Sequence, residues 1–324
     1  MSRRYLAGFV QDGLFNPLVA PTPTYLYNLY AWGENSQGQL GLNNRTNYSS
    51  PKQVGSLTTW SNISAGFYHT IATKTDGTLW SWGNNVLGQL GLGNVTRYSS
   101  PKQVGSLTTW LNISAGAYHT IATKTDGTLW SWGQNTKGQL GLNNRTNYSS
   151  PKQVGSLTTW SKILAGIYFE LATKTDGTLW AWGDNSQGQL GLNNRTYYSS
   201  PKQVGSLTTW SNISAGFYHA ITTKTDGTLW SWGLNNLGQL GLGNITNYSS
   251  PKQVGSLTTW LNISAGFYHT IATKTDGTLW SWGRANSGEL GLNNLTDYSS
   301  PKQVGALTTW TKISSRSIST IALG

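Results

Sequence analysis

The stretch SPKQVGSLTTW occupies residues 50–60, and it or a near copy returns every 50 residues along the 324-residue chain. The copies end at Trp60, Trp110, Trp160, Trp210, Trp260 and Trp310. A strict period of roughly 40 to 50 residues with strand-like content is typical of propeller blades or of a solenoid. The repeat therefore decides the fold class before any single residue does.

Each repeat carries the pattern of four short strands. Residues 68–74 (YHTIATK) alternate between apolar and polar side chains, an Asp-Gly turn follows at Asp76 and Gly77, and TLWSWG alternates again, which predicts a hairpin. A third strand is expected from Trp60 to Ala65, and a short fourth strand around Gln53 and Val54. Four short strands per repeat describe a propeller blade.

The two ends of the repeat region predict how the propeller closes. Residues 313–322 align with residues 63–72, and the chain then stops before the next strand, whereas the strand from Asn28 to Gly33 (NLYAWG) aligns with residues 78–83. We therefore expect an all-β, six-bladed β-propeller over residues 25–324, in which the strand from Asn28 to Gly33 completes the C-terminal blade and leaves no open edge. The alternative is that this strand pairs with a neighbouring molecule, giving a swapped oligomer or a fibre.

The repeat resembles that of a known family. The motif WGNNVLGQLGLGN (residues 82–94), preceded by SAGFYHTIATKTDGTLW (residues 64–80), resembles the repeat of the regulator of chromosome condensation family over about residues 25–324. The resemblance implies a propeller, although the founding member has seven blades where this chain encodes six. Relatives include a nucleotide exchange factor, enzyme inhibitors and scaffolds, so the family does not by itself assign a function. The loop residues of the exchange factor are not matched, and that activity is not expected.

No residue pattern predicts catalysis. The chain has no cysteine, and five of its eleven acidic residues, Asp76, Asp126, Asp176, Asp226 and Asp276, are hairpin-turn residues. The other six acidic residues are scattered, so no pair is spaced for general acid and base catalysis. We expect no catalytic residue, no cofactor and no enzyme activity.

Four histidines share one position of the repeat: His69, His119, His219 and His269. The equivalent residues in the other repeats are Phe169 and Ser319, and no acidic or cysteine co-ligand is near in sequence. We interpret the histidines as part of the scaffold rather than as a metal site.

The net charge of +11 arises largely from lysines that recur with the repeat, such as Lys52 and Lys74. We interpret this charge as favouring solubility. The alternative is that a ring of the lysines equivalent to Lys52 attracts an anionic glycan, a cell-surface ligand or lipid headgroups. No run of Lys or Arg interleaved with aromatic residues is present, so a nucleic-acid partner is not expected. The longest apolar stretches, of about five residues, are too short to span a membrane.

The repeats differ from one another in few places, and these places lie mainly in Gly- and Asn-rich loops, where recognition residues are commonly found. The four residues after each Trp-Gly pair form one variable set, and residues about ten positions later form a second. A third variable position holds Phe67, Ala117, Ile167, Phe217 or Phe267. From the first two sets we take as candidate partner-binding residues Glu34, Gln37, Arg45, Asn84, Val86, Arg97, Gln134, Lys137, Arg145, Asp184, Arg195, Tyr197, Leu234, Leu237, Arg284 and Asp297. Neutral drift in exposed loops is the alternative explanation.

Residues 1–24 lie outside the repeat and form a separate arm that ends in the Pro-rich link NPLVAPTPT. The candidate assembly residues of the arm are Arg3, Arg4, Tyr5 and Phe9. The opening MSRRYLAGFV resembles the start of structural proteins of marine tailed bacteriophages. That resemblance implies a virion-associated structural or adhesion protein, attached by the arm to other virion subunits and part of an oligomer or larger assembly. The alternative is a soluble cytoplasmic protein-binding module or inhibitor that uses the variable loops.

Overall fold

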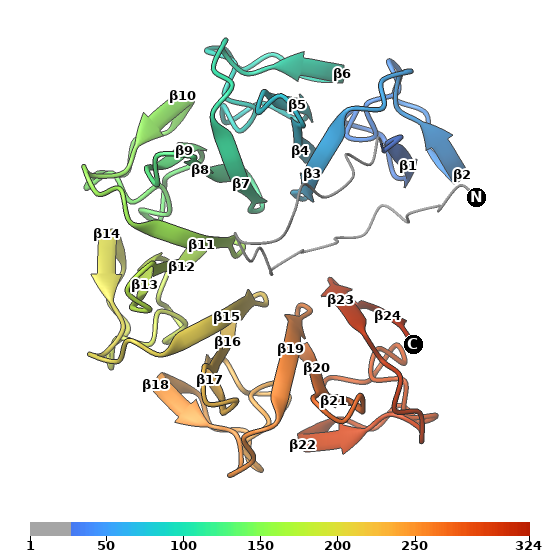
Figure 1. Ribbon diagram of the computed structural model, residues 1–324, viewed down its shortest axis with the longest axis vertical. Helices are drawn as coiled ribbons and strands as arrows, with labels where there is room; N and C mark the ends of the chain where they lie inside the picture. Colours follow the sequence, from blue (N-terminus) through green and yellow to red (C-terminus); the bar gives the residue numbers. More distant parts are fainter. Residues whose placement is uncertain (1–26) are drawn as a thin grey trace, which may run out of the picture. The chain divides into compact units, whose positions relative to one another are not determined.

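The computed structural model describes residues 27–324, and within them all regular structure is β-strand (Figure 1). The predicted arm, residues 1–24 with Arg3, Arg4, Tyr5 and Phe9, lies outside the described residues. In residues 27–324, no helix has the length and apolar character needed to cross a membrane.

Five four-stranded antiparallel sheets and two two-stranded sheets follow one another along the chain. The four-stranded sheets are β3–β6 (Trp60–Ala65, His69–Lys74, Leu79–Gly83, Tyr98–Gln103), β7–β10 (Trp110–Ala115, His119–Lys124, Leu129–Gly133, Tyr148–Gln153), β11–β14 (Trp160–Ala165, Phe169–Lys174, Leu179–Gly183, Tyr198–Gln203), β15–β18 (Trp210–Ala215, His219–Lys224, Leu229–Gly233, Tyr248–Gln253) and β19–β22 (Trp260–Ala265, His269–Lys274, Leu279–Gly283, Tyr298–Gln303). The two-stranded sheets are β1–β2 (Tyr30–Gly33, Tyr48–Gln53) and β23–β24 (Lys312–Arg316, Ser319–Leu323). The repeated four-stranded sheets confirm the prediction of a multi-bladed β-propeller.

The Asp-Gly hairpin predicted from the sequence is confirmed in each complete sheet. In β16–β17, Gly227 adopts a φ of +77°, and the Asp226 carboxylate accepts hydrogen bonds from the Thr228 backbone N–H (2.9 Å) and from its hydroxyl (2.6 Å). A left-handed φ favours glycine because a Cβ would be strained there. The short polar side chain and the glycine together fix the turn that aligns the two strands.

Two features of the strands were not predicted as the structure has them. The alternation of residues 68–74 predicts a strand, which is confirmed as β4, but the alternation does not correspond to one buried and one exposed face, because all six residues of β4 are buried. The second strand of a blade lies inside its sheet, and packing against both neighbouring blades can cover both of its faces. The fourth strand of the repeat is longer than expected and begins earlier in the sequence. A short strand was expected around Gln53 and Val54, whereas β2 begins at Tyr48, includes Pro51 and ends at Gln53. Proline is tolerated there because this is an edge strand, which does not need every N–H for pairing.

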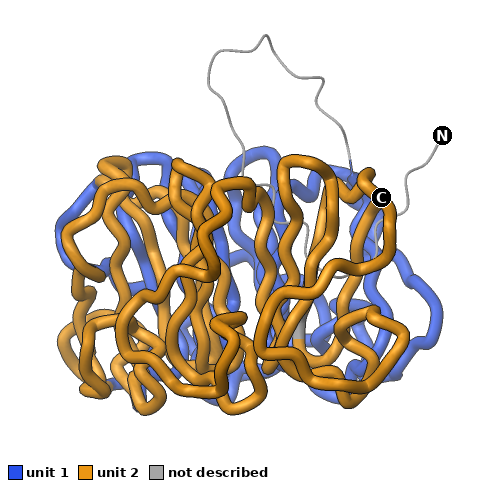
Figure 2. The backbone as a smooth tube through the Cα atoms, turned by 90° about the horizontal axis from the view of Figure 1, so that it is seen from below, with its two compact units in different colours: residues 1–136, 146–158 blue, residues 137–145, 159–324 orange. Residues whose placement is uncertain are grey.

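The described chain divides into two compact units, and each complete sheet lies within one of them (Figure 2). One unit contains the described residues up to Thr136 together with Thr146–Thr158, and the other contains Lys137–Arg145 and Thr159–Gly324. The boundary between arm and propeller at residues 24 and 25 stays a prediction.

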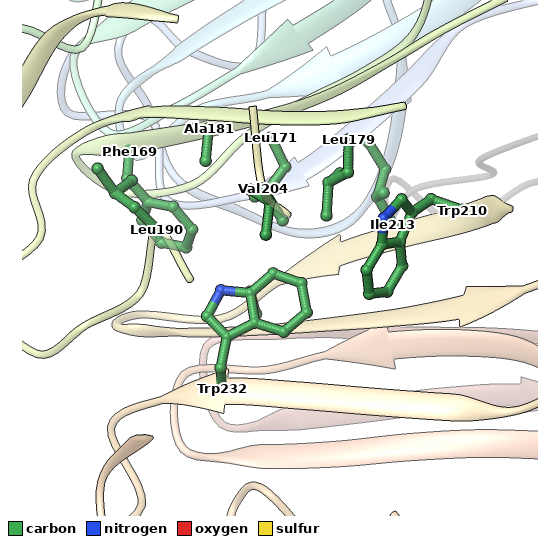
Figure 3. Close-up of a cluster of buried hydrophobic side chains, with 10 residues drawn as sticks. Phe169, Leu171, Leu179, Ala181, Leu190, Val204, Trp210, Ile213 and Trp232 are labelled. Atoms are coloured by element: carbon green, nitrogen blue, oxygen red, sulfur yellow. The ribbon is translucent and has the colours of Figure 1, made fainter. Parts of the chain in front are cut away.

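The core lies between successive sheets of a unit. In the second unit, one cluster joins Phe169, Leu171 and Leu179 of one sheet to Trp210 and Trp232 of the next (Figure 3). The Trp232 side chain is 0% exposed, and its indole N–H donates to the backbone carbonyl of Gln189 (2.9 Å). The repeated tryptophans therefore supply both apolar area and a hydrogen bond between sheets.

Four of the buried indoles, those of Trp82, Trp132, Trp232 and Trp282, each pack closely against a glycine, where a side chain would not fit. A Cβ on Gly241 would lie 2.7 Å from the Trp282 indole nitrogen, and the residue has a φ of +73°. We expect Gly241→Ala to lower the free energy of unfolding by about 2–4 kcal/mol, from backbone strain and overpacking together. The matched control is Gly255→Ala, because Gly255 has a similar φ of +62° but nothing within 4 Å of the added carbon. Urea unfolding should show a clearly larger loss for Gly241→Ala, and equal losses would contradict this account of the packing.

Closure by the strand from Asn28 to Gly33 stays a prediction. β1 is hydrogen-bonded in a sheet with β2, and β24 in a sheet with β23. Beside β24, a groove of about 440 Å³ is lined by Leu290, Trp310 and Thr320, among others of the same unit.

The repeat gives a direct test of closure. Ile71 pairs with Ser81 in a complete sheet. The equivalent residues of the predicted closing blade are Ile321, five periods after Ile71, and Ala31, one period before Ser81, so closure predicts that these two lie opposite each other. The chain has no cysteine, so the double variant Ala31→Cys, Ile321→Cys should form one disulfide at the mass of a single chain. A disulfide-linked dimer would instead support the swapped arrangement. No disulfide under oxidising conditions would count against both arrangements.

Candidate functional site

The two ends of each sheet differ in character. At one end lie the connection between the first two strands and the long connection between the last two, and in β3–β6 these are joined by the Asn84 N–H donating to the Tyr68 carbonyl (2.7 Å). We call this the loop end. At the opposite end, which we call the turn end, lie the Asp-Gly turn and the connection to the next sheet, joined by the Trp110 N–H donating to the Gly77 carbonyl (3.1 Å).

The long loop is built on a polar frame that five repeats share, whereas the loop after Gly283 has Ala285 and Glu289 in place of the frame asparagine and glutamine. The Asn85 amide accepts from the Leu90 N–H (2.9 Å) and donates to the Asn94 carbonyl (2.9 Å), while the Gln89 side chain accepts from the Leu87 N–H (2.9 Å). Asn85 and Gln89 are both fully buried. The repeated asparagine and the Gly-Gln-Leu-Gly motif therefore fix the conformation of the loop. The side chains of the two variable residues between them, such as Val86 and Leu87, are not needed to hold it.

Most of the predicted partner-binding residues lie accessible on this frame at the loop end. Those with exposed side chains are Glu34, Arg45, Val86, Arg97, Arg145, Arg195 and Asp297. Those half-buried are Gln37, Gln134, Lys137, Tyr197, Leu234, Leu237 and Arg284. Their common end within each sheet follows from the strand order, although their role in binding stays a prediction.

Asn84 and Asp184 differ from the other candidates because they are only 6% and 3% exposed. The Asn84 carbonyl oxygen accepts from the Val86 N–H (3.0 Å), and the Asp184 carboxylate accepts from the Ser186 N–H (2.8 Å). We therefore assign these two side chains to holding their loops rather than to direct contact with a partner.

An aromatic cluster at the loop end was not among the predicted partner-binding residues. In the second unit, Phe217 lies 4.4 Å from Tyr218, 5.3 Å from Phe267 and 5.8 Å from Tyr268, measured between ring centroids. The Phe217 and Tyr268 rings are stacked, and all four side chains are half-buried. Burial raises the pKa of the Tyr218 hydroxyl, and the nearby Asp184 carboxylate raises it further.

The first unit carries a smaller cluster of the same kind. Phe67 lies 6.4 Å from Tyr68 and 6.3 Å from Tyr118. The sequence contains a pattern that could have predicted both clusters. In five repeats the residue at the third variable position is followed directly by a tyrosine. Only the antiparallel strand order shows that these tyrosines share an end with the variable loops.

The histidines contact the next sheet rather than one another. His219 Nε2 lies 3.2 Å from the Thr270 hydroxyl, which in turn donates to the Gln239 carbonyl (2.9 Å). Burial lowers the pKa of His219 to about 3, so this side chain is neutral at physiological pH. Where the histidine is replaced by Phe169, the threonine position of the next sheet holds Ala220, and both lie in one apolar cluster. This paired exchange supports the scaffold role of the histidines, and residues 27–324 contain no group of three potential metal ligands.

Charged groups of both signs lie at the loop end, and some of them are paired. Arg284 Nε lies 3.5 Å from a Glu289 carboxylate oxygen, and Lys137 Nζ lies 5.1 Å from the centre of the Tyr197 ring. Arg284 and Glu289 stand where the second repeat has Asn84 and Gln89, which are also hydrogen-bonded to each other (2.9 Å). The surface therefore combines aromatic rings, amides and isolated charges instead of one dominant charge.

Comparison with known proteins identifies the fold. The family model described as "RCC1-like domain" matches residues 24–211 and 113–324. A crystal structure of human WBSCR16 aligns with a TM-score of 0.79 at 20% sequence identity, covering 91% of this chain and 81% of that one. Yeast RCC1 (Prp20) bound to Kap60 aligns with a TM-score of 0.79 at 20% identity, covering 99% and 84%. Prp20p from Saccharomyces cerevisiae aligns with a TM-score of 0.65 at 18% identity, covering 91% and 90%. No curated protein matches the sequence.

Proposed function

The chain belongs to the RCC1-like domain family, and from this premise we propose that it is a protein-binding module whose loop end carries the partner-binding surface. One observation carries the proposal. A half-buried aromatic cluster, including Phe217, Tyr218 and Tyr268, lies at the same end as loops that differ between repeats, and five of these loops share one polar frame.

The chemistry of this end suits protein recognition. Tyrosine and arginine are enriched among the residues that dominate binding energy, since they offer large contact area and a polar group. Asparagine, serine and glycine in surrounding loops supply adaptable hydrogen bonding at low cost, as they do in antibody binding sites. Variable loops on a shared polar frame can change specificity without disturbing the core.

The related structures support the class of function. Yeast RCC1 was crystallised bound to Kap60, and the structure of Prp20p was described with its binding to Gsp1p and histones. At 20% identity or less these partners do not transfer to this chain, but binding of proteins is the property that we carry over.

Other interpretations receive less support. The virion-associated role, with its virion subunits and adhesion function, finds no support in the family match or in the similar structures, whereas the alternative of a protein-binding module fits both. We retain the absence of enzyme activity as a proposal, since no comparison bears on it directly.

The test is affinity capture from an extract of the source organism. In the loop variant, residues 86–87, 136–137 and 236–237 carry the Ser-Gln sequence of residues 36–37 and Leu234 becomes Glu, as at residue 34, whereas the buried Asn84, Asp184 and Ala285 and the frame asparagines are unchanged. We expect wild-type protein to capture a partner that the loop variant does not, with the melting temperatures of the two proteins equal within a few degrees. A turn-end control, Leu207→Ser with Leu257→Ser, should capture the partner normally. Equal capture by the loop variant would refute the proposal.

The aromatic cluster should be the strongest contributor. We expect Tyr218→Ala with Tyr268→Ala to weaken binding of the captured partner by roughly tenfold to a hundredfold, as replacement of buried aromatic anchors does elsewhere. Calorimetric titration measures this change. An affinity within a factor of two of wild type would remove the cluster from the binding surface.

A further inference from the structure

The isolated charges at the loop end of the second unit are mainly positive where they are exposed. Among the side chains that the structure describes, the exposed basic ones at this end are Arg145, Arg195, Lys202, Lys252 and Lys302. The acidic residues of this unit outside the Asp-Gly turns are Glu170, Asp184, Glu289 and Asp297. Only the last of these has an exposed side chain. Within residues 27–324, no ion pair joins any of the exposed basic side chains to a carboxylate, so their charges are available to a partner.

Tyrosine rings hold the lysines of this set at the loop end. Lys252 lies on β18, which begins at the loop end with Tyr248, and the Lys252 Nζ is 5.4 Å from the centre of the Tyr248 ring. The equivalent distances are 5.6 Å in the preceding sheet and 5.3 Å in the following one. The Tyr248 hydroxyl accepts from the Asn244 amide (3.3 Å), which ties the ring to the long loop. A contact between an ammonium group and a ring positions the charge without neutralising it.

The arginines of the set lie in long loops that are tied to the next sheet. Two residues before Arg195, the Asn193 N–H donates to the Ser249 carbonyl (2.7 Å), beside the start of β18. The equivalent bond before Arg145 is 2.6 Å long and reaches the start of β14. Each guanidinium is therefore carried by a fixed loop on the same end as the lysines, and it can pair with a carboxylate through two parallel hydrogen bonds.

The hairpins of the turn end add no comparable surplus. In β16–β17, Lys224 Nζ lies 3.7 Å from the centre of the Trp230 ring, and Asp226 is close to the same lysine. Hydrogen bonds from Thr228 lower the pKa of Asp226, which keeps this carboxylate ionised at physiological pH. Each hairpin of this kind carries one lysine and one aspartate, so its net charge is close to zero.

The aromatic cluster adds an apolar surface at the loop end of the same unit. Phe217 packs against Tyr218, Phe267 and Tyr268, and its ring is stacked on that of Tyr268 at an interplanar angle of 18°. All four side chains are half-buried, so part of each ring stays accessible. A partner that offers both carboxylates and an apolar side chain complements the two features together.

We propose that the partner-binding surface of the loop end takes an acidic segment of a protein. Its carboxylates pair with the exposed arginines and lysines, and one of its apolar side chains packs on Phe217 and Tyr268. This inference rests on the proposed protein-binding function and names the chemistry of the partner.

The packing of the rings favours a peptide over a nucleic acid. Proteins that bind single-stranded nucleic acids stack successive bases on open aromatic faces along a basic groove. Here one face of Phe217 is taken by Tyr268, and its edges meet Tyr218 and Phe267 at interplanar angles of 67° and 81°. Such a packed cluster offers an apolar patch to a side chain rather than a series of separate stacking sites.

The experiment measures binding of a fluorescent peptide, made of glutamates around one central phenylalanine, to the full chain by fluorescence anisotropy. We expect wild-type protein to bind this peptide and to release it at about 1 M NaCl, where the screening length is about 3 Å. A peptide with serine in place of the phenylalanine should bind roughly tenfold more weakly, because the apolar contact is lost. A peptide with lysine in place of every glutamate should not bind.

Two variants separate local pairing from general attraction to a basic protein. The loop-end variant Arg145→Gln, Arg195→Gln, Lys252→Gln should bind the acidic peptide roughly tenfold more weakly. The matched control Leu207→Glu, Leu257→Glu, Leu307→Glu lowers the net charge by the same amount at the turn end, on side chains that are 45%, 47% and 57% exposed. It should keep most of the affinity, and the melting temperatures of both variants should stay within a few degrees of wild type.

Three results would overturn the inference. The first is failure of wild-type protein to bind the acidic peptide, and the second is equal weakening of binding by the loop-end variant and its turn-end control. The third is binding of a single-stranded oligonucleotide of the same net charge at least as tightly as the peptide, which would favour a nucleic acid. Capture of a partner that the loop-end charge variant binds as wild type does would also overturn it, while leaving the proposed protein-binding function in place.

Discussion

Trp232→Ala is expected to lower the free energy of unfolding by about 3–5 kcal/mol, the range for removing a fully buried tryptophan. Trp232 is 0% exposed, lies 6.1 Å from the Trp210 ring and donates a hydrogen bond to the Gln189 carbonyl. Its loss would leave a cavity between two sheets of the second unit and an acceptor without its donor. Chemical denaturation monitored by circular dichroism measures the change.

Two further variants separate packing from hydrogen bonding. Trp232→Phe keeps an aromatic ring but loses the indole N–H, so we expect a smaller loss of about 1–3 kcal/mol. Trp230→Ala removes a half-buried tryptophan that lies outside the fully buried set, and its effect should also be smaller than that of Trp232→Ala. A loss below about 1 kcal/mol for Trp232→Ala would contradict the assignment of the repeated tryptophans to the core.

Acidification is expected to destabilise the protein through its buried histidines. Burial lowers the pKa of His219 to about 3, with nearby His269 adding to the effect, and burial lowers the pKa of His269 to about 4. The unfolded chain binds a proton at each histidine below about pH 6.5, whereas the folded chain does not until the lower pKa is reached. Stability is therefore fully present above pH 6.5 and falls as the pH drops toward 3, by on the order of 4 kcal/mol for His219 alone.

The chain itself supplies the control for this effect. The double variant His219→Phe, Thr270→Ala copies the natural pair of Phe169 and Ala220, which already packs between two sheets. We expect the variant to unfold at a lower pH than wild type while its stability at pH 8 changes by only about 1 kcal/mol. Acid unfolding followed by tryptophan fluorescence measures both quantities. An unchanged acid midpoint would mean that His219 does not take up a proton on unfolding.

Much of the fold could be predicted from the sequence because the repeat shows the same signals several times. The Asp-Gly turn at Asp76 and Gly77 and the strand from Trp60 to Ala65 were located correctly, since both depend on local conformational preference. The burial of both faces of β4 was not predicted, because it depends on the neighbouring sheets and not on the strand itself. The extent of β2 through Pro51 was missed for a related reason, because an edge strand relaxes the usual exclusion of proline.

The candidate site was predictable in part. Variation between repeats located the loops that hold Arg45 and Arg284, but it cannot distinguish an exposed side chain from one that caps a turn, as Asn84 and Asp184 do. The aromatic cluster around Phe217 was missed because its tyrosines do not vary, and their place at the loop end follows only from the antiparallel strand order.

The most direct test of the protein-binding proposal is amide hydrogen exchange, read by mass spectrometry, on the protein alone and with its captured partner. We predict slower exchange in the complex at loop-end segments such as residues 216–218, 234–247 and 266–268, with turn-end segments such as residues 254–259 unchanged. Slower exchange confined to the turn end, with the loop end unchanged, would contradict the assignment of partner binding to the loop end.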